Sequence, residues 1–359
     1  MNRTPESSLC LYDDPDMAGW ERGAFKAEAQ NIARKLEDTP PNAMTPAIFS
    51  QEAMEILCPC EVQVVAHDRD WLEDKCMNAF ITLARSSCDP PIMLELSYCG
   101  GAEDDKPVVI VGKGTTFDCG GLCLQRGGDM SECRADMAGA AVIVATLKAL
   151  AMLKVPINVN ALIPLYENMP GGMAIKPGDV VTGLCGKNIR VTDTSKEARV
   201  ILTDPLTFSS NYKPCLVINV ATLTAGVRTA LGTSSTGVFT TSDVVWNELS
   251  RAGAETGDRV WRLPLWKHFT SNIKSYDSVD VDNVGNGRGG DPCVGAAFLR
   301  EFAPPIDFLH LDITGTGMLA SDPSHPYLRE GYMTGRPTRT LVQFLYQMAC
   351  PMDKSDDGR

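Results

Sequence analysis

The sequence contains no uninterrupted run of about 18 apolar residues, which is the length that a membrane-spanning helix requires. Its first residues, MNRTPESSLCLYDDPD, also lack the apolar core of a secretory signal peptide. We find no internal repeat, low-complexity tract or long run of charge. These absences predict an intracellular globular protein without a membrane anchor.

The sequence has fewer basic than acidic residues. The chain has 33 Lys and Arg against 45 Asp and Glu, so its net charge is −12 at pH 7. An acidic surface repels phosphate groups, which argues against nucleic acid and anionic membranes as partners. A partner with a cationic surface remains compatible with this charge.

The 13 cysteines do not form the spaced pairs of a disulfide framework. Most lie in apolar stretches, which indicates free buried thiols in a reducing compartment. Cys58 and Cys60 are the only close pair, and no second pair follows at the spacing of a zinc site. We interpret them as packing residues, with metal binding as the weaker alternative.

The order of elements indicates an α/β protein. Residues 14–37 carry apolar side chains at helical spacing, and Thr45-Pro46 supplies an N-cap and first-turn proline for a second helix to about Leu57. From Val108 onward, short apolar runs alternate with helical patterns. Such alternation predicts a central sheet with helices on both faces, and the apolar segment 136–153 predicts a buried helix.

Polar residues at the ends of these elements form a candidate site. Lys113 follows the strand VVIVG and Asp118 lies five residues later, with glycines on both sides. Asp136 begins the buried helix, and Glu197 lies at another element boundary. Taken alone, each residue is explained equally well as part of a surface ion pair or as a helix cap. Together, oxygen ligands from several strand ends indicate a divalent metal site.

Seven blocks in this order resemble the catalytic domain of the cytosolic leucine aminopeptidases, two-metal exopeptidases: VGKGTTFDCGG, RADMAGAA, PLYENMPGGMAIKPGDVV, INVATLTAG, ETGDRVWRLPL, GAAFLREF and GRPTRTL. The resemblance runs from about Trp20 to Phe344 and implies a three-layer α/β/α sandwich with a mixed central sheet. It divides the chain into an extension and linker helix (1–44), a catalytic-type domain (45–350) and a polar tail (351–359). The family's N-terminal domain is expected to be absent.

The resemblance assigns the tight metal site to Lys113, Asp118, Asp136 and Glu197, all of which are present. The looser site of the family adds an aspartate where this chain has Ser195. A neutral hydroxyl is a poor ligand for a hard dication. We therefore expect at most one divalent ion, Zn or Mn, per chain, or none.

The resemblance also identifies changes in the catalytic and pocket positions. Arg199, which belongs to the family's oxyanion-stabilising block, is retained, whereas Gln125 replaces a catalytic lysine. Lys196 adds a positive charge beside Ser195, and Ala198 replaces a glycine, which would strain the loop if a positive φ were needed there. The residues expected to line the substrate pocket are Cys133, Thr222, Leu223, Ala225 and Thr314.

These departures predict a leucine aminopeptidase-like protein without normal activity, retained as a structural component in trimers, hexamers or a filament with copies of itself or related chains. The alternatives are a weak or altered-specificity metal-dependent aminopeptidase and a peptide-binding regulator. The family includes testis-restricted members that have lost metal ligands and persist as structural proteins. By that resemblance the chain would belong to a sperm structure, axoneme or mitochondrial derivative, and otherwise to the cytoplasm.

Overall fold

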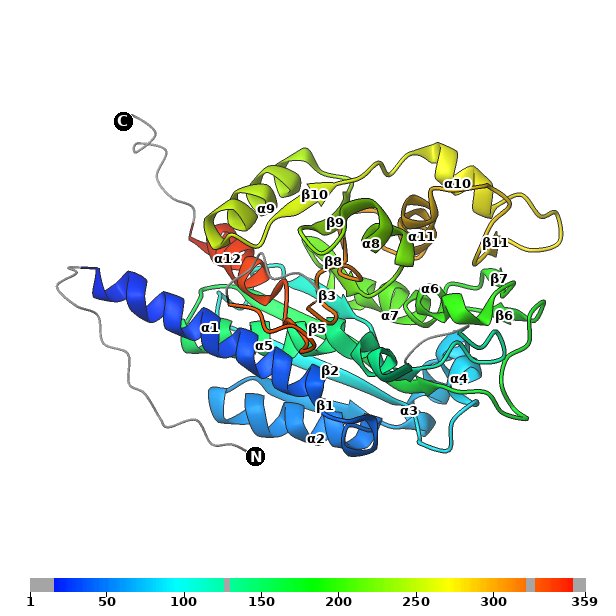
Figure 1. Cartoon of the computed structure of the whole chain (residues 1–359), viewed down its shortest axis with the longest axis horizontal. Helices are drawn as coiled ribbons and strands as arrows, with labels where there is room; N and C mark the ends of the chain where they lie inside the picture. Colours follow the sequence, from blue (N-terminus) through cyan, green and yellow to red (C-terminus); the bar gives the residue numbers. More distant parts are fainter. Residues whose placement is uncertain (1–15, 126–129, 321–326, 351–359) are drawn as a thin grey trace.

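The computed structural model describes residues 16–125, 130–320 and 327–350. The expected polar tail lies outside these residues. The chain forms a nine-stranded mixed sheet covered by helices on both faces (Figure 1), which confirms the predicted α/β/α architecture. A three-stranded sheet of the order β11-β7-β6 lies beside it.

The strands of the larger sheet run in the order β1-β2-β5-β3-β8-β12-β9-β10, and β4 pairs with the end of β5. Strands β5, β3, β8 and β12 are parallel, whereas β1, β2 and β9 join by antiparallel pairing. The strand bounds are β1 Gln63–His67, β2 Ile92–Cys99, β3 Val108–Gly112, β4 Gly114–Asp118, β5 Asn158–Asn168, β6 Val180–Thr182, β7 Asn188–Arg190, β8 Leu216–Ala221, β9 Thr236–Thr240, β10 Val260–Arg262, β11 Val281–Asp282 and β12 Asp307–Asp312.

Two apolar cores lie on the two faces of this sheet. Helices α1, α2, α5, α9 and α12 cover one face, and α3, α4, α6, α7 and α11 contribute to the other. The helix bounds are α1 Met17–Asp38, α2 Pro46–Leu57, α3 Arg69–Asp74, α4 Asn78–Ala84, α5 Ala138–Met152, α6 Glu197–Ile201, α7 Thr203–Phe208, α8 Ala225–Leu231, α9 Asp243–Thr256, α10 Lys267–Ile273, α11 Asp291–Arg300 and α12 Thr338–Ala349.

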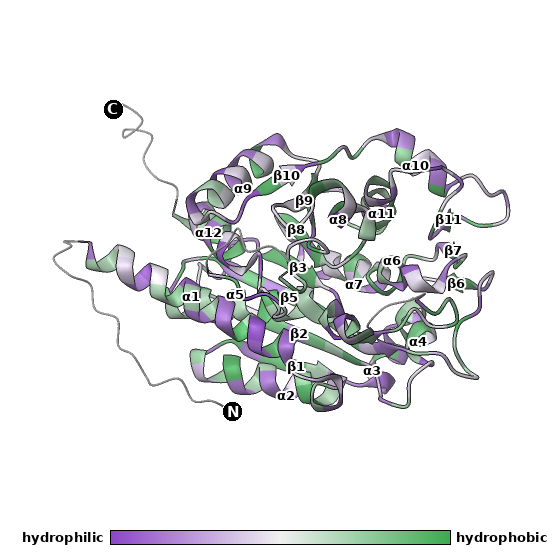
Figure 2. Ribbon diagram, in the orientation of Figure 1, coloured by the Kyte–Doolittle hydropathy of each residue, from purple (hydrophilic) through white to green (hydrophobic). Residues whose placement is uncertain are grey.

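The residues of β3 show why both faces are buried. Val108 and Ile110 belong to one core, whereas Val109 and Val111 belong to the other. Successive side chains of a strand point to opposite faces, so a continuous apolar run is needed where both faces are covered. The hydropathy colouring accordingly shows green ribbon in the central strands and in α5 (Figure 2).

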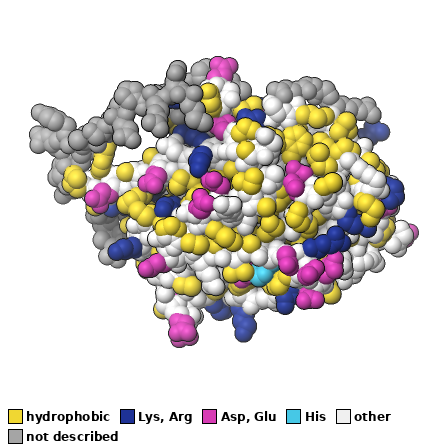
Figure 3. All heavy atoms as spheres, turned by 90° about the horizontal axis from the view of Figure 1, so that it is seen from below, with side chains coloured by type: hydrophobic (Ala, Val, Ile, Leu, Met, Phe, Trp, Pro, Cys, Tyr) yellow, Lys and Arg dark blue, Asp and Glu magenta, His cyan; other side chains and the backbone are white. Residues whose placement is uncertain are grey.

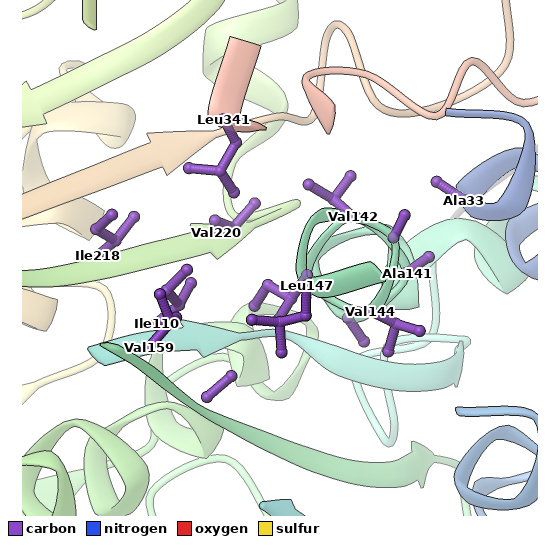
Figure 4. Close-up of a cluster of buried hydrophobic side chains, with 14 of the residues drawn as sticks. Ala33, Ile110, Ala141, Val142, Val144, Leu147, Val159, Ile218, Val220 and Leu341 are labelled. Carbon is purple, nitrogen blue, oxygen red and sulfur yellow. The ribbon is translucent and has the colours of Figure 1, made fainter. Parts of the chain in front are cut away.

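Helix α5 is the central helix of the first face. Its side chains pack between the strands β3, β5 and β8 on one side and the helices α1 and α12 on the other (Figure 4). The segment Met130–Met152 is long and apolar enough to pass as a membrane span by length and composition, although Asp136 and Lys148 interrupt its apolar run. Within the protein, 83% of that window is buried, as in the core helix of a globular fold.

The two helices predicted before the sheet are confirmed with small shifts. Helix α1 ends at Asp38, just before Pro40, and Thr45 caps α2 by accepting a hydrogen bond from the Ile48 amide at 3.5 Å. Strands β1 and β2 were not predicted. Helix α1 contributes Ala29 and Ala33 to the same core as the sheet.

The expectation of buried thiols is confirmed for three of the described cysteines and wrong for most of the others. Cys119, Cys133 and Cys293 are buried. The exposed ones are Cys58, Cys76, Cys88, Cys99, Cys185 and Cys215.

Candidate metal centre and cavity

Four residues from separate parts of the chain meet at the ends of the central strands. The Lys113 ammonium nitrogen lies 3.6 Å from Asp118 Oδ2, 3.2 Å from Asp136 Oδ2 and 3.1 Å from Glu197 Oε1. Lys113 is 1% exposed, and the three acids are also buried. We call these four residues the acidic centre. Their burial overturns the alternative of a surface ion pair.

Asp136 reaches the acidic centre because α5 packs closely against the central strands. A Cβ atom on Gly139 would lie 2.2 Å from the Val220 carbonyl oxygen, and one on Gly112 would lie 2.4 Å from Ile143. Glycine is therefore required at position 139, where the contact is with backbone, whereas at position 112 the contact is with the flexible end of the Ile143 side chain. Asp136 does not cap the helix as in the plain alternative, because the N-cap residue of α5 is Met137.

Each carboxylate turns one oxygen toward Lys113 and the other toward a neutral donor. Asp118 Oδ1 accepts hydrogen bonds from the Gly120 amide at 2.8 Å and from Asn168 at 2.7 Å. Asp136 Oδ1 accepts from Thr222 at 2.8 Å. The remaining oxygen of the third acid, Glu197 Oε2, accepts from Tyr166.

Sequence reasoning missed Tyr166 and Asn168 as parts of the site. Both belong to β5 and to the block PLYENMPGG, and their position at the end of that strand was the available signal. Because they hold the outer oxygens, the inner oxygens converge on one point.

The acidic centre carries an excess of buried negative charge. Burial raises the pKa of Asp118 to about 6, with Glu197 adding to this rise and Lys113 opposing it. Burial also raises the pKa of Asp136 to about 7, again against the attraction of Lys113. Burial lowers the pKa of Lys113, but the three acids outweigh it, so its pKa is raised overall. The single positive charge of Lys113 does not balance the negative charge of the three carboxylates.

This donor set fits one divalent ion. One oxygen from each of Asp118, Asp136 and Glu197 lies within 4.8 Å of the others. Carboxylate oxygens are the ligands of hard divalent cations, and an ion there would balance the charge that Lys113 leaves. Coordination by the Lys113 nitrogen would also require loss of a proton.

A cavity of about 640 Å³ opens beside the acidic centre. The walls contain all five residues expected in the substrate pocket, together with Gln125, Ser195 and three members of the acidic centre. Glu197 and Arg199 are not among its lining residues. The lining residues that the sequence did not identify are Glu132, Thr224, Arg228, Asp291 and Met318.

Ser195 lines this cavity without supplying a carboxylate. Its hydroxyl donates to Asp193 Oδ1 at 2.7 Å, and its amide donates to the same oxygen at 2.9 Å. Among the residues that the structure describes, the one cluster of three metal-ligating side chains is that of Asp118, Asp136 and Glu197. The described chain therefore supplies no further acid to this cluster in place of Ser195.

Gln125 is also neutral at the cavity wall. Its amide nitrogen donates to the Asp118 carbonyl oxygen at 3.4 Å, and its oxygen lies 3.8 Å from the Cys133 sulfur. Burial, followed by the charge of Asp136, raises the pKa of Cys133 to about 12. The thiol therefore stays protonated and uncharged at neutral pH.

Arg199 is fully buried and already paired. One terminal nitrogen donates to the Asn283 carbonyl oxygen and the other to Asp291 Oδ1, each at 2.6 Å. Lys196 donates to the same Asp291 oxygen at 2.8 Å. Burial raises the pKa of Asp291, but Arg199 and Lys196 outweigh it, so the pKa is lowered and the carboxylate is ionised.

Ala198 causes no backbone strain. It lies inside α6, and it is not among the described residues with positive φ. The expectation of a strained or reshaped loop would have required a positive φ, which this helix does not have.

Comparisons with known proteins identify the family of this chain. Residues 31–342 match the model of the cytosol aminopeptidase family, catalytic domain. The chain is 43% identical to the cytosol aminopeptidase of Homo sapiens over 345 residues, covering 95% of this chain and 66% of that protein. It is 39% identical to the cytosol aminopeptidase of Dictyostelium discoideum over 350 residues, covering 96% and 65%.

The chain thus spans a little under two thirds of the length of these relatives. Among solved structures, the bottromycin maturation enzyme BotP superposes with a TM-score of 0.89 at 32% identity, covering 97% of this chain and 75% of that one. The same enzyme in complex with Mn superposes with a TM-score of 0.87 at 34% identity, covering 94% and 73%.

Proposed function

Since the chain belongs to the cytosol aminopeptidase family, we propose that it keeps a one-metal centre in the family's catalytic fold, lacks ordinary aminopeptidase turnover and serves as an assembly component. The observation that carries this proposal is the Ser195 hydroxyl, which bonds to Asp193 where the family resemblance expects a metal-binding carboxylate. The relatives are named cytosol aminopeptidases, which supports an intracellular location.

The residues that would hold the ion are Lys113, Asp118, Asp136 and Glu197. A divalent ion bound there would polarise a carbonyl or a water oxygen. Thr222 and Asn168 fix the orientation of two of the carboxylates, and the nearby cavity admits a ligand. Hydrolysis in a two-metal site needs a second ion and a cationic oxyanion donor, and Ser195 and Gln125 replace the groups that would provide them.

Arg199 gives a second reason for low turnover. Its guanidinium is neutralised by Asp291, which also binds Lys196. A donor already satisfied by a carboxylate stabilises a developing oxyanion poorly, because it must first give up that bond. This pairing supports the proposal independently of the metal ligands.

Peptide binding is the second candidate function. The cavity keeps its walls, including the hydroxyls of Thr222, Thr224 and Thr314 and the paired charges of Arg228 and Glu132. Such polar groups in a concave site can bind a peptide end without cleaving it. A weak or altered-specificity aminopeptidase would use the same cavity. Measurable hydrolysis of a bound peptide would distinguish it from a protein that only binds the peptide.

Metal analysis tests the one-metal part of the proposal. Protein incubated with excess Mn²⁺ and freed of unbound metal is expected to retain about one ion per chain, because the four ligands form a single cluster. Elemental mass spectrometry measures this ratio. Glu197→Gln should abolish retention, whereas Ser195→Ala should leave it unchanged. A ratio of two ions per chain would contradict the proposal.

Size measurement tests the assembly part. Trp261, 61% exposed, lies within β10, which is an edge strand of the larger sheet, and Trp266, 67% exposed, lies four residues after the strand ends. A second face also presents many hydrophobic side chains between mixed charges (Figure 3). Exposed apolar surface of this kind favours self-association.

We expect light scattering at micromolar concentration to give trimers, hexamers or larger assemblies with copies of itself or related chains. Replacement of both tryptophans by Ser should shift the distribution toward smaller species. A stable monomer that also fails to associate with related chains would leave the structural role without support.

A further inference from the structure

Helix α5 carries one charged residue, Lys148, in an otherwise apolar sequence. Its side-chain nitrogen lies 2.9 Å from the Cys60 sulfur. Within residues 16–125, 130–320 and 327–350, no carboxylate lies within 4.0 Å of this nitrogen. Lys148 is partly exposed, and its near side-chain neighbour is a thiol rather than a carboxylate.

The surrounding backbone holds Cys60 in this position. Cys60 ends the 3₁₀ turn Cys58–Cys60 that continues α2, and the next residue, Glu61, turns the chain away with a φ of 61°. The sulfur also faces the Ile56 carbonyl oxygen at 3.9 Å. Cys60 and Lys148 are both partly exposed, so a small oxidant can reach them.

We propose that Cys60 and Lys148 form an oxidation site, in which one oxygen atom bridges the sulfur and the side-chain nitrogen. The distance between them is short for a contact with an atom as large as sulfur and is close to the span of two single bonds that meet at one oxygen. Neither side chain needs to move far.

Dioxygen is the oxidant, and the reaction balances with one molecule of it. The S–H bond of Cys60, one N–H bond of the Lys148 amine and the O–O bond break. S–O and O–N bonds form, and the second oxygen atom leaves as water with the two released hydrogens. The thiol and the amine are oxidised while dioxygen is reduced. Two molecules of a dithiol reverse the reaction: the S–O and O–N bonds break, the thiol and the amine are regenerated, the bridging oxygen leaves as water, and both dithiols are oxidised to disulfides.

The bridge would join the end of α2 to the middle of α5. Its two residues are 88 positions apart in the sequence, so the cross-link restricts the unfolded chain more than the folded one. The oxidised protein should therefore melt at a higher temperature than the reduced protein. The site is independent of the acidic centre and of the proposed function.

Intact-mass and peptide-mapping mass spectrometry test the site on full-length protein kept either in air-saturated buffer or under anaerobic conditions with dithiothreitol. The aerobic sample is expected to gain the mass of one oxygen less two hydrogens, about 14 Da, on a linked peptide pair that contains both residues. Dithiothreitol should reverse the gain. Methylation adds a similar mass but is not reversed, so an irreversible gain contradicts the proposal.

Matched variants separate this site from its neighbours. Cys60→Ser and Lys148→Met should abolish the gain, whereas Cys58→Ser should keep it, because Cys58 is exposed and two residues away. A loss of about 2 Da would indicate a Cys58–Cys60 disulfide, and a gain of about 16 Da a sulfenic acid. Either result in place of the bridge, or an unmodified aerobic sample, would overturn the proposal without reference to any variant.

Discussion

Leucyl-amide hydrolysis is expected to stay at background in the unaltered chain and in the single variants Ser195→Asp and Gln125→Lys, and to rise by about 100- to 1000-fold when the two changes are combined. The reason is that the two positions supply different parts of one site. An aspartate at 195 restores a ligand for a second ion, and a lysine at 125 restores a cationic oxyanion donor. Groups that act as a unit give strongly non-additive effects.

The structure suggests one further change for this experiment. Lys196 lines the cavity beside Ser195 and places its ammonium on Asp291. A positive charge near a restored second site would oppose binding of a second cation. Lys196→Ala added to the double variant is therefore expected to increase both metal retention and turnover.

Turnover is measured with leucyl-amide and Mn²⁺, and metal content is measured on the same samples. The control adds Glu197→Gln to the active combination, which should return turnover to background because it removes a ligand of the acidic centre. Hydrolysis by the unaltered chain at an ordinary enzyme rate, about 1 s⁻¹ or more, would contradict the proposed loss of activity. Two bound ions without turnover would indicate that the pairing of Arg199 with Asp291, rather than the metal content, limits activity.

The second large effect concerns stability. Arg336→Leu is expected to lower the free energy of unfolding by about 3–5 kcal/mol, because it leaves the buried Asp258 carboxylate without its ionic partner. The two side chains are 1% and 0% exposed, and Asp258 Oδ2 has no hydrogen-bond partner. Arg336 also donates to the carbonyl oxygens of Thr233 and Ser234.

Urea unfolding followed by circular dichroism measures this change. Arg69→Ala is the matched control: Arg69 pairs with Glu73, both side chains are about half exposed, and such pairs contribute about 0–1 kcal/mol. Arg336→Leu combined with Asp258→Leu should recover part of the loss, because no charge then remains buried. A cost below about 1 kcal/mol for the single change would show that water reaches Asp258.

Local patterns in the sequence were sufficient for several elements. Helices α1 and α2 follow from apolar spacing, the Pro40-Pro41 break and the Thr45 cap, and β3 follows from a run of apolar residues that both cores require. The sequence patterns did not predict strands β1 and β2. No residue of β1 is fully buried, and partly exposed positions interrupt the buried residues of β2. Strand β1 pairs with β2, and the place of β2 depends on pairing with β5, which lies far along the chain.

The acidic centre was likewise predictable as a set of residues. The family blocks identify Lys113, Asp118, Asp136 and Glu197, because a motif is recognised from its residue types and spacing alone. Their burial, however, and the orientation of each carboxylate come from donors such as Asn168, which lies 50 positions from Asp118. The sequence could not separate a surface ion pair from a buried centre, because desolvation depends on what covers the group.

The sequence by itself determined the α/β class and the residues of the acidic centre, and the family resemblance that it carries places Ser195 where a metal-binding aspartate is expected. These features depend on residue type and on neighbours a few positions away. Only the tertiary structure decided that Asp291 pairs with Arg199 across 92 positions and that Lys148 meets Cys60 across 88. Such contacts arise when packing of the two cores brings distant segments together. Their chemistry is a property of the folded chain, because no local pattern encodes which side chains will share a buried space.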